Sequence, residues 1–256
     1  MKDAILQAIS DIEAKSGVRV LYAAESGSRA WGFASPDSDY DVRFIYVHPR
    51  DWYVGIGEPR DVIEAMLPGD LDLSGWDLRK TLRLFLRGNS ALNEWLDSPI
   101  VYAERGALAD RMRALLPAAF KAPAAYHHYL RMAQGVHAEH LGADPVRLKK
   151  LFYVLRPLLA CRWIRHAGSQ PPTAFAGLLA APWVSDHERG MIADLEAAKA
   201  MAGEGARVVL QPAVRGWLES ELLQATDAAA HLRSSAEIQV ATLDRLMVEA
   251  VAAAWA

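Results

Sequence analysis

The sequence contains a single cysteine, Cys161, which therefore has no partner for a disulfide. Its neighbours in RPLLACRW are mostly apolar, and this setting predicts a buried, inert thiol. The chain also has no run of about 18 uncharged apolar residues, the length that a membrane-spanning helix needs. The N-terminal stretch MKDAILQAISDIEAKSG is charged and lacks the apolar core of a signal peptide. These absences predict a soluble, cytoplasmic protein with no membrane partner.

An excess of positive charge is absent as well. The formal net charge is −3 at pH 7, so bulk charge does not attract polyanions, and any nucleic-acid site must be a local patch. The length of 256 residues allows one large domain or two modest ones. The sequence shows no internal repeat.

The residue pattern changes near position 100. Before it, short runs rich in β-branched and aromatic residues predict strands at 18–26, 40–47, 60–67 and 71–76, with helices at 3–15 and 77–86. Asp77 is the expected N-cap of the second helix. After it, alanine- and leucine-rich stretches predict helices at 105–116, 121–142, 145–166, 187–202 and 215–253. We therefore expect an α+β fold, with an α/β domain over 1–115 and an all-α domain over 116–256.

Two aspartates stand one residue apart in SGSRAWGFASPDSDYDVRFIYV, residues 26 to 47. Asp39 and Asp41 stand at i and i+2 at the start of a predicted strand, so their side chains point the same way. Asp72, in LDLSGW, lies in a similar strand-like setting. Three carboxylates converging from two neighbouring strands favour Mg²⁺ or Mn²⁺, and two such ions are the usual apparatus of in-line phosphoryl transfer. Asp70 and Asp77 lie close by and remain alternatives for the third carboxylate.

Gly27 and Ser28 stand ahead of the paired aspartates. Glycine lets the backbone approach a ligand closely, and a serine at the start of a helix offers an amide and a hydroxyl to phosphate oxygens. We therefore expect these two residues to lie against phosphate oxygens of a ligand.

A Gly-Ser pair, a spacer of about ten residues and an Asp-x-Asp flanked by apolar residues resemble the polymerase-β nucleotidyltransferase superfamily. Further strings, DLSGWDLRKTLRLFLRGN, NEWLDSPIVY and LKKLFYVLRPLLACRWI, resemble its RlaP-like branch of predicted RNA-repair nucleotidyltransferases. The resemblance spans residues 26 to 164. It implies a catalytic domain with a small mixed sheet, and transfer of a nucleoside monophosphate from an NTP such as ATP to a hydroxyl. It also implies Asp39 and Asp41 as metal ligands, with Asp72 as third carboxylate and as general base or metal orienter. By the same resemblance, Gly27 and Ser28 would hold the β- and γ-phosphates.

Local basic patches offer a surface for a polyphosphate or an RNA end. In VRLKKLFYVLRPLLACRWIR, the residues Lys149, Tyr153 and Arg156 fall on one helical face, where they could meet triphosphate oxygens. A solvated face over buried leucines is the alternative. Arg43 lies near the motif, where it either has a functional role or forms a structural ion pair.

The function predicted is a metal-dependent nucleotidyltransferase acting on an RNA end. The same chemistry on a protein or small-molecule hydroxyl is one alternative, and a non-catalytic module that binds nucleotide or RNA is another. The choice of NTP, the need for a template, the number of nucleotides added and the oligomeric state are not encoded in any motif of the sequence.

Overall fold

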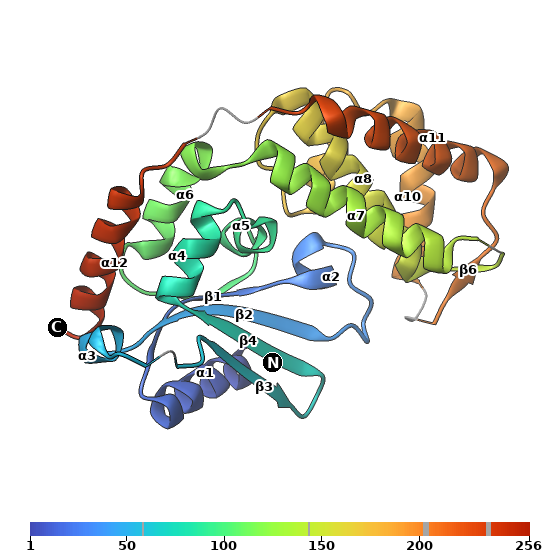
Figure 1. Ribbon diagram of the computed structural model, residues 1–256. Coiled ribbons are helices and arrows are strands. Elements are labelled where there is room, and N and C mark those ends of the chain that lie inside the picture. The colour runs from blue at the N-terminus through green and yellow to red at the C-terminus, as the bar shows by residue number, and fades with distance from the viewer. Residues whose placement is uncertain (58, 143, 202–204, 234–236) are drawn as a thin grey trace. The chain divides into compact units, whose positions relative to one another are not determined.

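The computed structural model describes residues 1–57, 59–142, 144–201, 205–233 and 237–256 (Figure 1). The chain forms two compact units. We call them the sheet unit (Met1–Ala30, Asp39–Ala119 and Ala236–Ala256) and the helical unit (Trp31–Ser38 and Phe120–Ser235). This division differs from the predicted continuous domains at 31–38, 116–119 and 236–256, each of which belongs to the other unit.

The sheet unit is built on a mixed sheet of five strands in the order β3-β4-β2-β1-β5. Strands β2 and β4 are parallel, and the other neighbouring pairs are antiparallel. The four predicted strands and the small mixed sheet are confirmed, whereas β5 was not predicted. The strands are β1 (Arg19–Glu25), β2 (Tyr40–Val47), β3 (Val62–Leu67), β4 (Leu71–Asp77) and β5 (Val101–Glu104).

Helices cover both faces of this sheet (Figure 1). Apolar residues of α1 pack with Val42, Phe44 and Leu73 on one face. Helices α4, α5, α6 and α12 supply the core on the other face, around Ile45 and Val47. The helices of this unit are α1 (Lys2–Ser16), α2 (Gly27–Trp31, whose last residue belongs to the helical unit), α3 (Arg50–Val54), α4 (Leu78–Leu86), α5 (Ser90–Leu96), α6 (Leu108–Ala119) and α12 (Val240–Ala254).

The register of β2 against β4 is reinforced by an aromatic ring. Phe44 and Gly75 are partners across the parallel pair. A Cβ at position 75 would overlap the Phe44 ring, so only glycine leaves room for it. Asp77 then ends β4 and caps α4 by accepting a hydrogen bond from the Arg79 amide at 2.8 Å, as predicted.

The helical unit has its core between α7 and α8, with a two-strand pairing of β6 and β7 beside them. The prediction of one helix over 215–253 is wrong, because α11 ends at Ala228 and a separate helix begins at Val240. The elements are α7 (Ala122–His140), β6 (Val146–Arg147), α8 (Leu148–Ala167), α9 (Phe175–Leu179), α10 (Asp186–Ala200), β7 (Arg207–Val208), α11 (Pro212–Ala228) and a 3₁₀ turn (Ala229–His231).

The spacer of the sequence motif packs inside the helical unit. Phe33 contacts the rings of Phe152 and Phe175 at centroid distances of 5.1 and 5.7 Å. The buried Lys199 ammonium donates to Ser35 Oγ at 2.9 Å. The chain therefore leaves the sheet unit after Ala30 and returns to it at Asp39.

Cys161 is buried as predicted, and burial raises the pKa of its thiol. Across the described ranges, no helix combines the length and apolar character that a bilayer crossing requires.

Candidate functional site

Two of the predicted carboxylates meet on neighbouring strands. Asp41 of β2 and Asp72 of β4 are direct partners in the parallel ladder. Because side chains alternate along a strand, Asp41 and Arg43 share one face of β2, and Asp72 and Ser74 share the same face of β4. The parallel pairing that Phe44 and Gly75 help to hold therefore brings the two acids together.

A guanidinium lies between these two acids. Arg43 Nη2 is 3.0 Å from Asp41 Oδ1 and 2.8 Å from Asp72 Oδ2. Its Nη1 donates to the carbonyl of Asp72 at 3.3 Å, which fixes the fork against both strands. The three side chains are between one-fifth and one-third exposed, so this cluster stays open to solvent. Asp41 and Asp72 thus already share a single cation, and their oxygens are ligands that Mg²⁺ or Mn²⁺ prefers.

Gly27 closes the opposite side of Asp41. Its φ of 60° lies in the left-handed region, and a Cβ there would overlap Asp41 Oδ2. The neighbouring Ser26 amide donates to the Asp41 carbonyl at 2.8 Å. The start of α2 is therefore held directly against the carboxylate, with Ser28 almost fully buried beside it. This placement explains why the motif needs glycine at position 27.

A further acidic residue, Glu25, supports Asp41 and was not predicted from the sequence. Glu25 is 1% exposed, and its carboxylate accepts the Asp41 amide at 2.7 Å and the Tyr102 hydroxyl. Burial raises the pKa of the Glu25 carboxyl, although the hydrogen bonds from Tyr102 and Asp41 lower it in part. The signal in the sequence was a lone glutamate at the end of an apolar strand, a position that requires a partner once buried.

Asp39 lies just before β2 and is exposed, and its carbonyl accepts from Arg29 Nε at 3.1 Å. Within the described ranges, no group of three His, Cys, Asp or Glu side chains converges in a way that could hold a metal ion. The arrangement is a pair, Asp41 and Asp72, with Asp39 two residues away along the chain.

The alternative third carboxylates have other positions. Asp70 lies in the turn before β4 with φ of 55°, and its carbonyl accepts the Tyr40 amide at 2.8 Å. Asp77 is buried, caps α4 and accepts from Tyr53 at 2.6 Å. Of the three aspartates, Asp72 is the one that shares a guanidinium with Asp41.

The other predicted nucleotide ligands, Lys149, Tyr153 and Arg156, belong to α8 of the helical unit. Lys149 and Tyr153 are partly buried, and the Tyr153 ring packs edge-on against Trp31 at 5.2 Å. Arg156 is 1% exposed, lies 4.4 Å from the centre of the Trp31 ring and donates to the Thr173 carbonyl at 3.2 Å. Arg156 therefore has a structural role in the core of this unit.

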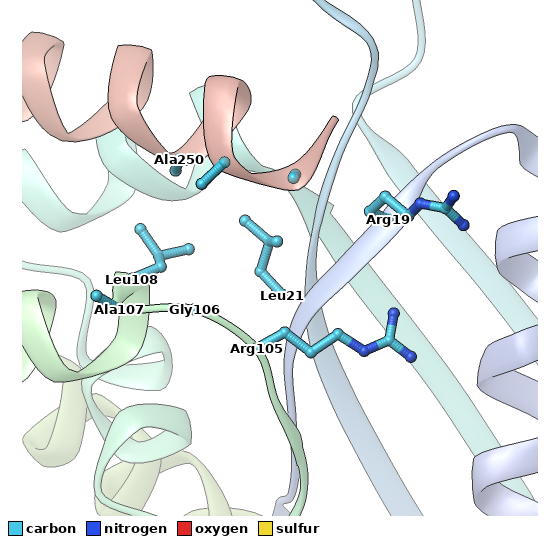
Figure 2. A pocket seen from close by; sticks show the side chains of 9 residues that line it. Arg19, Leu21, Arg105, Gly106, Ala107, Leu108 and Ala250 are labelled. Carbon is cyan, nitrogen blue, oxygen red and sulfur yellow. The ribbon is translucent and has the colours of Figure 1, made fainter. Parts of the chain in front are cut away.

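Two pockets of the sheet unit differ in their relation to the acids. Figure 2 shows an apolar pocket of about 270 Å³ between Leu21, Leu108 and Ala250, with Arg19 and Arg105 at its edge. It lies by the start of β1, whereas Gly27 and Asp41 lie by the end of that strand. A larger pocket of about 580 Å³ includes Arg43 and Asp72 in its wall. The second pocket is therefore the one that adjoins the candidate site.

Comparison with known proteins identifies relatives over the full chain. A family described as "RNA repair pathway DNA polymerase beta family" (RlaP) matches residues 1–249. A Bacillus subtilis (strain 168) protein described as "Uncharacterized protein YcgL" is 42% identical over 258 residues, covering 100% of this chain and 98% of the relative. A crystal structure of a nucleotidyltransferase-like protein from Exiguobacterium sibiricum 255-15 matches at a TM-score of 0.31 and 12% identity, covering 95% and 78% of the two chains. The structural match is too weak to support a conclusion.

Gly27→Ala is expected to destabilise the protein more than Gly17→Ala. Both glycines have φ near 60°, so both variants lose about 1 kcal/mol from left-handed backbone. Nothing lies within 4 Å of a Cβ at position 17, whereas one at 27 overlaps Asp41. Overpacking should add about 1–3 kcal/mol for Gly27→Ala, measured by urea unfolding. Equal losses in the two variants would show that Asp41 is not held as described.

Glu25→Gln is expected to flatten the dependence of stability on pH. The folded protein holds the Glu25 proton at pH values where the unfolded chain has lost it, because the folded pKa is raised above the ordinary value of 4.5. The free energy of unfolding of the wild type should therefore fall as pH rises from about 4.5 through the raised pKa. That part of the fall should be missing in Glu25→Gln and retained in the control Glu64→Gln, an exposed glutamate. Parallel curves for wild type and Glu25→Gln would contradict the assignment.

Proposed function

Since the chain belongs to the RNA repair pathway DNA polymerase beta family and is a polymerase-β-type nucleotidyltransferase, we propose that it transfers a nucleoside monophosphate from an NTP to a hydroxyl at an RNA end. The observation that carries the proposal is the pair of carboxylates on adjacent parallel strands, with the glycine turn packed directly against one of them. ATP is the NTP that we test first.

In this proposal, the triphosphate binds on the side of Asp41 that faces Gly27. Gly27 allows the closest backbone approach, and Ser28 offers its amide and hydroxyl to the β- and γ-phosphates. We retain Lys149 and Tyr153 as proposed contacts of the triphosphate, since both keep partial exposure on α8. Arg156 stays a prediction for direct nucleotide binding; its burial favours a role in positioning Trp31.

Asp39, Asp41 and Asp72 would hold two Mg²⁺ or Mn²⁺ ions, which would stabilise charge on the α-phosphate and favour ionisation of the attacking hydroxyl. Asp72 accepts the proton of that hydroxyl, or orients the hydroxyl for attack. The hydroxyl oxygen forms a bond to the α-phosphorus, the bond from that phosphorus to the bridging oxygen breaks, and pyrophosphate leaves. Arg43 lies beside both acids and supplies positive charge where negative charge accumulates.

A labelling experiment tests this function. Purified protein is incubated with each α-labelled NTP, Mg²⁺ or Mn²⁺, and cellular RNA. We expect label in RNA with the wild type, and a loss of at least about 100-fold in the Asp39→Asn/Asp41→Asn double variant and in Asp72→Asn, because each removes carboxylates that would hold the metal ions. Asp70→Asn is the matched control, since Asp70 lies in the turn just before β4, at a left-handed position that asparagine tolerates.

The location of the label decides between the alternatives. If the label appears on protein and not on RNA, the acceptor is a polypeptide hydroxyl. If the label appears on a small molecule, the acceptor is a hydroxyl of that molecule. Transfer by the double variant at the rate of the wild type would disprove the mechanism. Binding of NTP without any transfer would favour a non-catalytic role.

Arg43 is expected to compete with divalent cations for Asp41 and Asp72. Its guanidinium contacts one oxygen of each acid, so a metal ion must displace it or share those oxygens. Arg43→Gln should bind Mn²⁺ several-fold more tightly than the wild type in calorimetric titrations without nucleotide, and should transfer nucleotide more slowly.

Two controls separate geometry from charge. Arg43→Lys keeps the charge but loses the planar fork, so its Mn²⁺ affinity should fall between those of wild type and Arg43→Gln. Arg60→Gln removes an exposed charge that pairs with Glu64, and its affinity should stay at the wild-type value. If Arg43→Gln and Arg60→Gln raise the affinity equally, net charge alone is responsible.

A further inference from the structure

The carboxylate pair has two different sides. On one side, the Gly27 backbone packs against Asp41 Oδ2, and the turn that begins there is the proposed contact of the triphosphate. On the other, Asp72 borders the open pocket of about 580 Å³, whose wall comes from Ser26 and from β2, β3, β4 and α5 of the sheet unit. A triphosphate on the glycine side therefore leaves this pocket for the second substrate.

The pocket has an aromatic wall. Asp72, Ser74 and Trp76 alternate along β4, so a carboxylate, a hydroxyl and an indole follow one another on the same face. Trp76 packs on Trp95 at a centroid distance of 3.9 Å, which fixes its ring. Trp95 is 4% exposed, whereas Trp76 is only partly buried and keeps surface toward the pocket.

The charge of the pocket restricts what can enter it. Among the described residues of its wall, Arg43 is the one cation, and both of its acid partners already engage it. Asp72 and Glu64 are also in the wall, and Glu64 pairs with Arg60. A phosphate on the acceptor end would therefore meet one cation that two carboxylates already engage, whereas a ring with hydroxyls needs no cation.

We propose that this pocket binds the terminal nucleoside of the acceptor, with its base stacked on Trp76 and its free 3′-hydroxyl directed at Asp72. The inference rests on the proposed function and adds the residue that selects the acceptor. Stacking on an aromatic side chain accepts any base, so the pocket selects an unphosphorylated nucleoside end and not a sequence. A reaction that leaves a 3′-hydroxyl, such as removal of a 3′-phosphate, must precede this one.

The test uses three short oligoribonucleotides of the same sequence: one with an intact 3′-hydroxyl end, one whose last nucleotide lacks its base, and one with a 3′-phosphate. Their affinities are measured by fluorescence anisotropy without NTP, so that no turnover is needed. For the wild type, we expect loss of the terminal base, or addition of the phosphate, to weaken binding about 10-fold.

Variants then assign the effect to one ring. In Trp76→Ala, the intact and base-free oligonucleotides should bind equally, because the partner of the base is gone. Trp76→Phe keeps a ring and should preserve most of the difference. Trp52→Ala is the matched control; Trp52 stacks on His48, lies outside the pocket wall and should leave the difference unchanged.

Several results would overturn the inference. These are equal wild-type affinities for the intact and base-free ends, a base effect that persists in Trp76→Ala, and no binding of any of the three, as expected for a protein acceptor. If Trp76→Ala does not fold, the wild type and Trp76→Phe decide. Transfer to RNA without a base effect would refute this inference alone, whereas a base effect without any transfer would refute the proposed function alone.

Discussion

Two negative charges on adjacent strands are the constraint around which the sheet unit is organised. At the ~5 Å spacing of neighbouring strands and an effective dielectric constant of about 20, two carboxylates repel each other by about 3 kcal/mol. Asp41 and Asp72 are held there because Arg43 lies between them and because the β2–β4 register leaves them no alternative. A site that tolerates this repulsion with a guanidinium is suited to divalent cations, which act on the same oxygens with more charge.

The supports of this pair come from distant parts of the chain. Gly27 fills the space beside the Asp41 carboxylate, and Glu25 binds the Asp41 amide from beneath. Glu25 is in turn bound by Tyr102 of β5, so the shortest edge strand of the sheet contributes to the position of the acid at its centre. The Gly27 support is steric, whereas the Glu25 hydrogen bonds are buried polar contacts whose loss leaves a group without a partner, and together they define the position of Asp41.

The strands and their acids were predictable from local patterns, and their supports were not. Alternation and β-branched residues predicted β1 to β4, and turn chemistry placed the acids at strand starts. β5 was not predicted because VYAE is short and carries no alternating pattern. The partner of Glu25 lies in this strand, so it was not predicted either. The bridging position of Arg43 depends on the parallel pairing of two strands whose first residues are 31 positions apart, which periodicity within one strand cannot reveal. The burial of Arg156 has the same cause, since its ring partner Trp31 is distant in sequence.

The spacer between Gly27 and Asp39 makes the motif depend on the helical unit as well as on the sheet unit. Residues 31–38 pack inside the helical unit through Phe33 and Ser35, so the two ends of the motif are joined by a segment that another core holds. Neither unit is one continuous piece of chain, since the sheet unit also includes the C-terminal α12. A cut between the units in sequence would therefore separate residues that pack together, and the stability of the helical core bears on the segment that connects Gly27 to Asp39. This connection is a physical reason for one chain to carry both units.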